Sequence, residues 1–99
     1  MVKHVICFKL ADCNEEKCVA AKEVLMSMKD NVPTVLDIDV NVDQLKSQRS
    51  YDVMLEVTLK DWEALEEYQK DKYHCDVVKT YMKKAAETSV AIDYETKGK

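Results

Sequence analysis

The sequence predicts an α+β fold in which four strands form one antiparallel sheet and two helices cover one of its faces. Two observations lead to this prediction. Four segments alternate apolar and polar residues with a period of two, as half-buried strands do, and two segments repeat apolar residues at helical spacing. Along the chain these segments come in the order strand, helix, strand, strand, helix, strand.

The composition limits the class of protein. The chain has 99 residues, of which 46% are apolar, and this suits a single domain over residues 1–99 with a core at about 2–95 and a polar tail at 96–99. A net charge of -4, with Arg49 as the only arginine, argues against a nucleic-acid partner. No apolar run is long enough for a membrane span, and the N-terminal segment is too short for a secretory signal. We therefore expect no membrane association and a cytoplasmic location.

The four cysteines do not follow the spacing of a metal site. Cys13 and Cys18 are separated by four residues, and no second close pair completes a zinc site, although His4 and His74 could be added to argue for one. We therefore expect no metal and no other cofactor. The thiols are expected to be reduced, with Cys7 and Cys18 buried as small apolar groups.

The first strand is expected over Val2–Leu10, with one apolar face. The residues of that face are His4, Ile6, Phe8 and Leu10, and those of the other face are Lys3, Val5, Cys7 and Lys9. A helix should follow, with Asp12 or Asn14 as its cap, and run to about Asp30, before Pro33. Its buried stripe would consist of Cys18, Ala21, Leu25 and Met28.

The second and third strands are expected over Thr34–Val42 and Tyr51–Leu59, joined by a polar loop. The inward side chains of the second strand would be Leu36, Ile38, Val40 and Val42, with Asp37, Asp39 and Asn41 outward. These acids could bind a hard cation, but charges also protect the edge of a sheet from unwanted pairing, and the edge interpretation is preferred. In the third strand, Asp52 and Glu56 are expected on the outward face.

The second helical segment contains the best candidate for chemistry. Asp61 can cap it, and apolar residues then recur at Trp62, Leu65 and Tyr68 and again at Val77, Val78, Tyr81, Met82 and Ala85. Tyr68 and His74 are six residues apart and would point in different directions on an unbroken helix. They can converge only if the helix breaks near Lys70–Lys72. The alternative, favoured by these residues alone, is a packed tyrosine and a surface histidine.

The last strand is expected over Thr88–Glu95, with either Val90, Ile92 and Tyr94 or Ser89, Ala91 and Asp93 facing the helices. The complete order is that of a ferredoxin-like βαββαβ sandwich, in which right-handed crossovers place both helices on one face. The other face would then expose Val5, Cys7, Met54 and Ile92 among charged residues. Such a patch predicts a homodimer packed sheet to sheet.

The chain resembles the stress-responsive α/β-barrel domain proteins over almost its whole length. The matching residues are 1–5, 8–10, 32–33, 51–52, 63–65, 68–69, 74, 77–78 and 93–95. Their order and spacing are specific for the fold. In this family the fold is a dimer whose two sheets form a barrel with the helices outside, so the resemblance implies a dimeric α/β barrel.

The resemblance to a plant polyketide cyclase of this family implies a possible chemistry. That enzyme closes a linear tetraketide-CoA intermediate by aldol condensation without a cofactor. Its catalytic tyrosine and histidine correspond to Tyr68 and His74, which implies that His74 is the general base and that Tyr68 orients the reacting oxygen. Further residues expected to bind substrate in the same hollow are His4, Ile6, Leu25, Ile38 and Leu55.

The chain also departs from that enzyme. It has Val53 in place of a histidine, Asp71–Tyr73 in place of a proline-containing segment, and Ala21 and Leu25 in place of bulky aromatic residues. We therefore prefer a small homodimeric protein that binds a small apolar ligand. The alternative is a cofactor-free cyclase or lyase that acts on a carbon acid. A metal-related or haem-related role is a third, weaker hypothesis.

Overall fold

The computed structural model describes residues 1–97 and contains one four-stranded antiparallel sheet in the order β2-β3-β1-β4. The strands are β1 (Val2–Leu10), β2 (Asp37–Val42), β3 (Val53–Leu59) and β4 (Ala86–Glu95). This is the ferredoxin-like fold that the sequence predicts. β2 and β4 are the edge strands, which agrees with the interpretation of the acids on β2 as edge protection. Of the predicted tail, residues 98–99 lie outside the described part.

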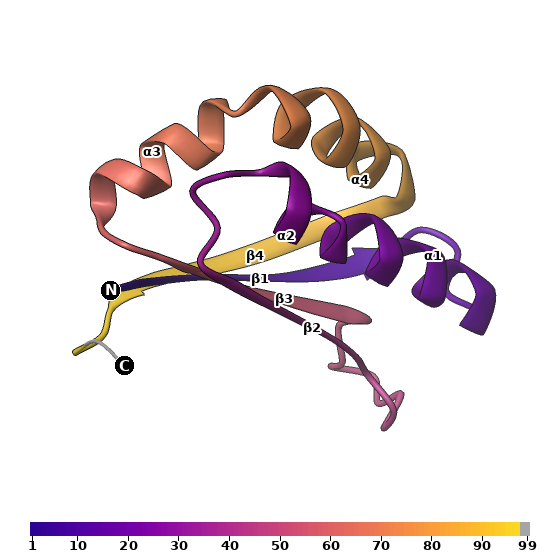
Figure 1. Cartoon of the computed structure of the whole chain (residues 1–99). Coiled ribbons are helices and arrows are strands. Elements are labelled where there is room, and N and C mark those ends of the chain that lie inside the picture. Colours follow the sequence, from indigo (N-terminus) through magenta and orange to yellow (C-terminus); the bar gives the residue numbers. More distant parts are fainter. Residues whose placement is uncertain (98–99) are drawn as a thin grey trace.

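The helices lie together over one face of the sheet, as Figure 1 shows. They are α1 (Glu15–Met26), α2 (Met28–Asn31), α3 (Trp62–Lys70), the π-helix η1 (His74–Lys79) and α4 (Thr80–Ala85). The core fills the space between this layer and the sheet. It includes Leu25 and Met28 from the helices and Leu55 and Val57 from β3, all with exposed fractions of 1% or less.

The first predicted helix is divided in two. Asn14 caps α1, and its side-chain oxygen accepts a hydrogen bond of 2.8 Å from the Lys17 N–H, so Asn14 and not Asp12 is the cap. The helix ends at Met26 because the chain continues through Ser27 into the short α2, which ends at Asn31. The predicted stripe of Cys18, Ala21, Leu25 and Met28 is buried as expected.

The second strand begins later than the sequence suggests, at Asp37 and not at Thr34. The preceding residues form a turn, in which the Val35 N–H donates to the Val32 carbonyl. Because of this turn, Val35 is buried in place of Leu36, which was expected to point inward and is 50% exposed. Two predicted members of the apolar stripes on the second helical segment are also largely exposed, Trp62 at 46% and Val77 at 42%.

Asp52 is the clearest departure from the predicted strand pattern. It precedes β3 and is only 6% exposed, although the alternation placed it on the outward face. Its carboxylate accepts hydrogen bonds from the Leu10 N–H at 2.8 Å and from the Cys13 thiol at 3.1 Å. Burial opposes the ionised form, but these two hydrogen bonds prevail and lower the pKa of Asp52. The hydrogen bond between Cys13 and Asp52 is the main cause that raises the pKa of the Cys13 thiol to about 11.

The register of β4 resolves which of its side chains face the helices. His4 pairs with Asp93, Ile6 with Ala91, and Phe8 with Ser89, and directly paired residues project to the same side of a sheet. Ser89, Ala91 and Asp93 therefore face the helices. Val90, Ile92 and Tyr94 lie on the outer face and are 50%, 67% and 45% exposed.

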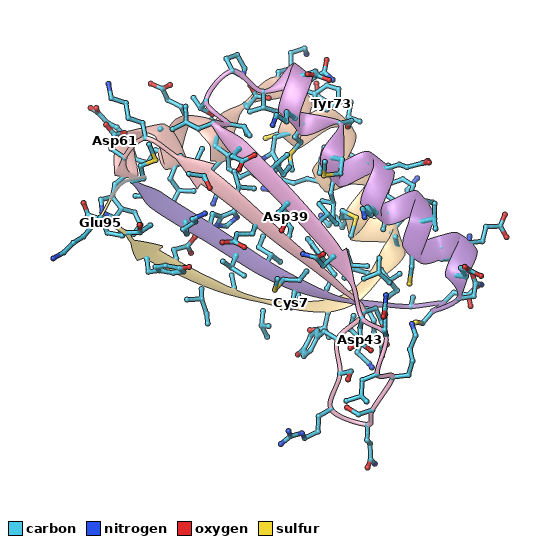
Figure 2. All side chains as sticks on the ribbon, turned by 60° about the horizontal axis from the view of Figure 1, so that its bottom comes forward. Cys7, Asp39, Asp43, Asp61, Tyr73 and Glu95 are labelled. Carbon is cyan, nitrogen blue, oxygen red and sulfur yellow. The ribbon has the colours of Figure 1, made fainter. Side chains whose placement is uncertain are left out.

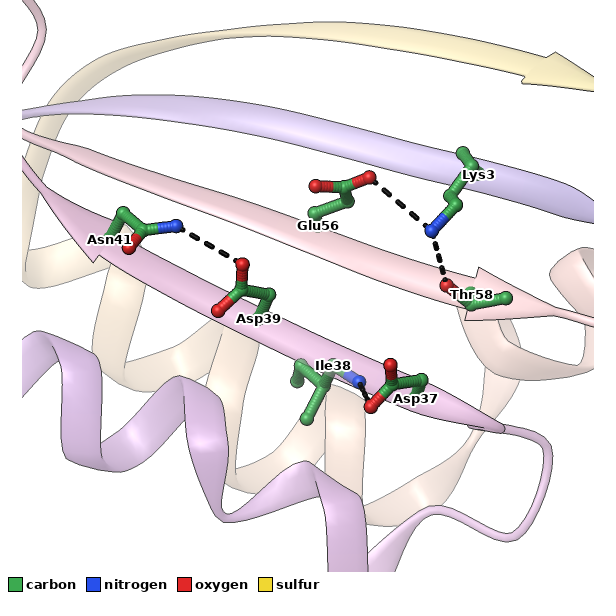
Figure 3. Close-up of polar contacts among 7 residues, drawn as sticks. All are labelled: Lys3, Asp37, Ile38, Asp39, Asn41, Glu56 and Thr58. Carbon is green, nitrogen blue, oxygen red and sulfur yellow. Dashed lines mark hydrogen bonds and ion pairs between the residues drawn. The ribbon is translucent and has the colours of Figure 1, made fainter. Parts of the chain in front are cut away.

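The outer face of the sheet has an apolar half and a polar half. The apolar half consists of Val5, Cys7, Met54, Val90, Ile92 and Tyr94, and Figure 2 looks obliquely onto this face. Cys7 is half-buried there and not buried as predicted. In the polar half, Lys3 contacts Glu56 at 3.4 Å and Thr58 at 2.9 Å, and Asn41 donates to Asp39 at 3.2 Å (Figure 3).

Candidate functional site

The second helical segment breaks where the sequence suggested it could. α3 ends at Lys70, and Asp71 leaves the helical conformation with ψ of 137°. The Asp71 carboxylate then accepts a hydrogen bond of 3.0 Å from the His74 N–H, as a capping residue does for the next helical segment. The break turns the chain so that His74 lies over the same part of the sheet as Tyr68.

The side chains of Tyr68 and His74 stack on one another. Their ring centroids are 4.3 Å apart and the ring planes make an angle of 27°. His74 begins the π-helix η1, and π-helical turns often occur where a side chain must be placed for function. With an exposed fraction of 6%, His74 is not the surface histidine of the alternative interpretation.

His4, on the central strand β1, also contacts Tyr68. Its ring meets the Tyr68 ring edge to face, with centroids 5.5 Å apart and an interplanar angle of 65°. His4 Nδ1 pairs with the Asp93 carboxylate, which comes from the neighbouring strand β4. A carboxylate at Nδ1 holds the proton on that nitrogen and leaves Nε2 free to accept a hydrogen bond.

The Tyr68 hydroxyl is directed into the protein. Tyr68 has an exposed fraction of 0%, and its hydroxyl donates to Met28 Sδ at 3.6 Å. Burial, together with the nearby charges of Asp71 and Asp93, raises the pKa of Tyr68 far above its usual range. The phenol therefore stays protonated at physiological pH. In this arrangement the ring, and not the hydroxyl, is the part of Tyr68 that both histidines contact.

His74 is uncharged at neutral pH. Burial is the main cause that lowers the pKa of its imidazole, and the charges of Lys79 and His4 act in the same direction against Asp71. Within residues 1–97, the buried Nδ1 of His74 has no hydrogen-bond partner. Burial therefore outweighs the charge of Asp71 and the contact with the Tyr68 backbone, both of which favour the protonated ring, and the pKa of His74 lies below its usual value.

A cavity of about 850 Å³ lies beside these three rings, between the β1–β4 side of the sheet and the α3–η1–α4 segment. Its floor is mainly apolar and, apart from the half-buried Ile6, buried. It is formed by His4, Ile6, Phe8, Leu25, Leu55, Tyr68, His74, Val78 and Met82. Its rim consists of exposed polar side chains, namely Gln69, Lys79, Thr80, Lys83, Glu87, Thr88 and Ser89. The cavity therefore opens to solvent on one side.

Most of the residues predicted to bind substrate line this cavity. They are His4, Ile6, Leu25 and Leu55, together with Tyr68 and His74. Ile38 does not line it, because it lies on β2 at the opposite edge of the sheet from β4. Sequence reasoning missed Asp93, Phe8 and the two lysines of the rim. Only the phase of β4, which the sequence left open, could have revealed Asp93.

Two classes of site find no support in residues 1–97. No cluster of three or more histidine, cysteine, aspartate or glutamate side chains within this range could hold a metal ion. No helix in the same range has the length and apolar character to cross a membrane. Beside its apolar floor, the cavity offers two imidazoles and a phenol, together with the carboxylate of Asp93 and the polar side chains of the rim.

Comparisons with known proteins agree with this architecture. The family model described as Stress responsive A/B Barrel Domain matches residues 2–96. No curated protein sequence matches the chain. Among solved structures, a protein with a ferredoxin-like fold from Mesorhizobium loti is 20% identical, with a TM-score of 0.74 over 98% of this chain and 97% of that one.

Two further solved structures are similar in fold. A dimeric protein with a ferredoxin-like fold from Bacteroides fragilis is 17% identical, with a TM-score of 0.77 over 96% of this chain and 95% of that one. The hydroxynitrile lyase of Passiflora edulis is 11% identical, with a TM-score of 0.76 over 94% and 90%. At these identities the likeness concerns the fold.

Proposed function

The chain belongs to the stress-responsive A/B barrel domain family, and from that premise we propose that it binds a small, mainly apolar ligand between its sheet and its helices. The observation that supports this function is the cavity of about 850 Å³ with its buried apolar floor. Sites for small molecules have volumes of roughly 300–1,000 Å³, with apolar walls and a few polar groups that fix orientation. The volume of this cavity lies within that range, and its lining likewise combines an apolar floor with a few polar groups.

The histidines that line the cavity define how a ligand is oriented. His4, held by Asp93, offers an imidazole nitrogen as acceptor, and the uncharged His74 ring stacks on Tyr68. A ligand that places a hydroxyl group there can donate a hydrogen bond to this nitrogen in a site of low polarity, where such bonds are strongest. Its apolar body then lies against Phe8, Leu25 and Met82.

We place the second copy of the chain on the outer face of the sheet. This face exposes Val90, Ile92 and Tyr94 beside the half-buried Val5 and Cys7. A contiguous apolar patch on a small protein is usually covered by a partner, and a twofold axis covers two equal patches at once. The Bacteroides fragilis protein of the same fold is described as dimeric, which supports this assignment.

Ligand binding can be tested with the neutral dye Nile red, whose fluorescence rises in apolar surroundings. We expect saturable binding, and we expect Ala91→Trp to abolish it because Ala91 lines the cavity. Val19→Trp is the matched control, since Val19 is 49% exposed on α1 and does not line the cavity. Equal binding by both variants, or no binding by the unaltered protein, would refute the proposal.

The buried His74 with its lowered pKa, together with the pairing of His4 with Asp93, favours a second function, cofactor-free proton transfer at a carbon acid. An uncharged imidazole can remove a proton from a carbon next to a carbonyl, and such bases contribute about 10²–10⁴-fold to a rate. In this function His74 is the general base, with the His4–Asp93 pair as a second candidate. Tyr68 would orient the carbonyl oxygen only after its hydroxyl turns away from Met28. The Passiflora edulis protein of this fold is named a lyase, which fits such chemistry.

Exchange of the protons next to the carbonyl of benzylacetone in D₂O separates the two functions. A catalytic site should accelerate this exchange over buffer, and His74→Gln should reduce the acceleration about a hundredfold. Asp93→Asn should reduce it only if His4 takes part, while Asp39→Asn on the outer face serves as a control. Nile red binding without any acceleration of exchange would leave ligand binding as the function.

A further inference from the structure

Two lysines stand at the mouth of the cavity without an acidic partner. Lys79 ends η1 and Lys83 lies one turn later on α4, and both line the cavity while remaining exposed. Within residues 1–97 neither forms an ion pair, whereas Lys3, Lys29 and Lys72 each do. Helical side chains lean toward the N-terminus of their helix, so both ammonium groups lean toward the end of the cavity that holds His74.

The remaining charges around the cavity are unevenly distributed. Among the described residues that line the cavity the acids are Glu87 and Asp93, and Glu87, two residues after the end of α4, is the one at the lysine end. Asp93 lies six residues further along β4, roughly 20 Å away at about 3.4 Å per residue, and is paired with His4. Two lysines against one glutamate leave a net charge of about +1 at the mouth, which suits a ligand with a single negative charge.

We propose that the ligand is an amphiphile whose apolar body carries one carboxylate, held at the mouth by Lys79 and Lys83. This assignment rests on the proposed ligand-binding function and names the class of ligand. Lys79 and Lys83 follow His74 by five and nine residues, or about 7.5 and 13.5 Å along a helix of ~1.5 Å per residue. A ligand that reaches both ends therefore has its carboxylate about 10 Å from the group that meets the histidines.

The test compares octanoate with its uncharged analogue octanamide as competitors of Nile red. Because exposed ion pairs are individually weak, the two lysines should make octanoate bind about fivefold tighter than octanamide. This preference should decrease at about 0.5 M salt, where charges are screened within a few ångströms. Competition is measured for each variant against that variant's own affinity for Nile red.

The variants separate a local charge effect from a change in total charge. Lys79→Gln with Lys83→Gln should remove the preference for octanoate, and Lys79→Arg with Lys83→Arg should keep it. Lys22→Gln with Lys60→Gln changes the net charge by the same amount at exposed sites away from the cavity and should leave the preference unchanged.

Two results would overturn this inference. Equal competition by octanoate and octanamide at low salt, with Nile red still bound, would show that the cavity takes ligands without regard to charge. A preference that survives the double Lys→Gln change would place the anion elsewhere. Failure of Nile red to bind at all would instead refute the ligand-binding function on which the inference rests.

Discussion

The imidazole of His74 lies against the phenol ring of Tyr68, with ring centroids 4.3 Å apart and planes inclined by 27°. This contact joins two helical segments that the break at Asp71 separates. It also removes His74 from water, and burial lowers the pKa of the imidazole. The stacked arrangement therefore favours the uncharged form of His74, and protonation of His74 destabilises the folded state.

His74 should make the stability of the protein depend on pH below neutrality. Its pKa in the folded state lies below the unfolded value of 6.5, so the unfolded chain binds the proton first as the pH falls. The contribution of the uncharged His74 to the free energy of unfolding is fully present above about pH 6.5. It decreases as the pH falls toward the pKa of the folded state. Urea unfolding at pH 7.5 and 5.5 should show a smaller loss for His74→Gln than for the unaltered protein. An equal loss in both would refute this assignment, because His4 is present in each.

The parts of the fold with regular periodicity were predictable. Alternation along Val2–Leu10 placed His4, Ile6 and Phe8 on the helix side, because a strand has only two faces. The convergence of Tyr68 and His74 could be predicted only conditionally. Residues 70–72 lack an apolar phase, which permits a break without requiring one.

The other parts of the site depend on contacts between distant segments. Asp93 meets His4 across 89 positions of sequence, and only the register of β4 against β1 brings them together. Ile38 shares the inward pattern of the cavity residues, but the strand order places it at the far edge. Asp52 departs from its alternation because the Leu10 N–H and the Cys13 thiol bond to it.

The pairing of His4 with Asp93 predicts one tautomer of His4. With the carboxylate at Nδ1, the neutral ring should carry its proton on Nδ1 and leave Nε2 unprotonated. Nitrogen chemical shifts of the imidazoles at pH 8.5 report this directly, and His74→Gln assigns the two histidines of the chain. Asp93→Asn should weaken the preference for this tautomer. A proton on Nε2 in the unaltered protein would contradict the pairing.

The Asp52 carboxylate should stabilise the fold through its two hydrogen bonds. Asp52→Ala leaves the buried Leu10 N–H without its partner, and an unpaired buried donor costs about 1–3 kcal/mol of the free energy of unfolding. Urea unfolding at pH 7 measures this loss. Asp39→Ala is the control, because Asp39 is exposed on the outer face and should change stability little. If Asp52→Ala lowered the free energy of unfolding no more than Asp39→Ala does, the hydrogen bonds of Asp52 would not stabilise the fold.

The last prediction concerns the apolar half of the outer sheet face. If two copies pack there, Ile92→Asp places a carboxylate from each copy in the interface, where an unpaired charge cannot be solvated. Ile92 is 67% exposed in the single chain, so the substitution should leave the monomer folded. We expect sedimentation at micromolar concentration to give a dimer for the unaltered protein and at least about a hundredfold weaker association for Ile92→Asp. Val19→Asp, on the exposed side of α1, should remain dimeric. A monomeric unaltered protein would remove this interface, and a dimeric Ile92→Asp variant would move it to another surface.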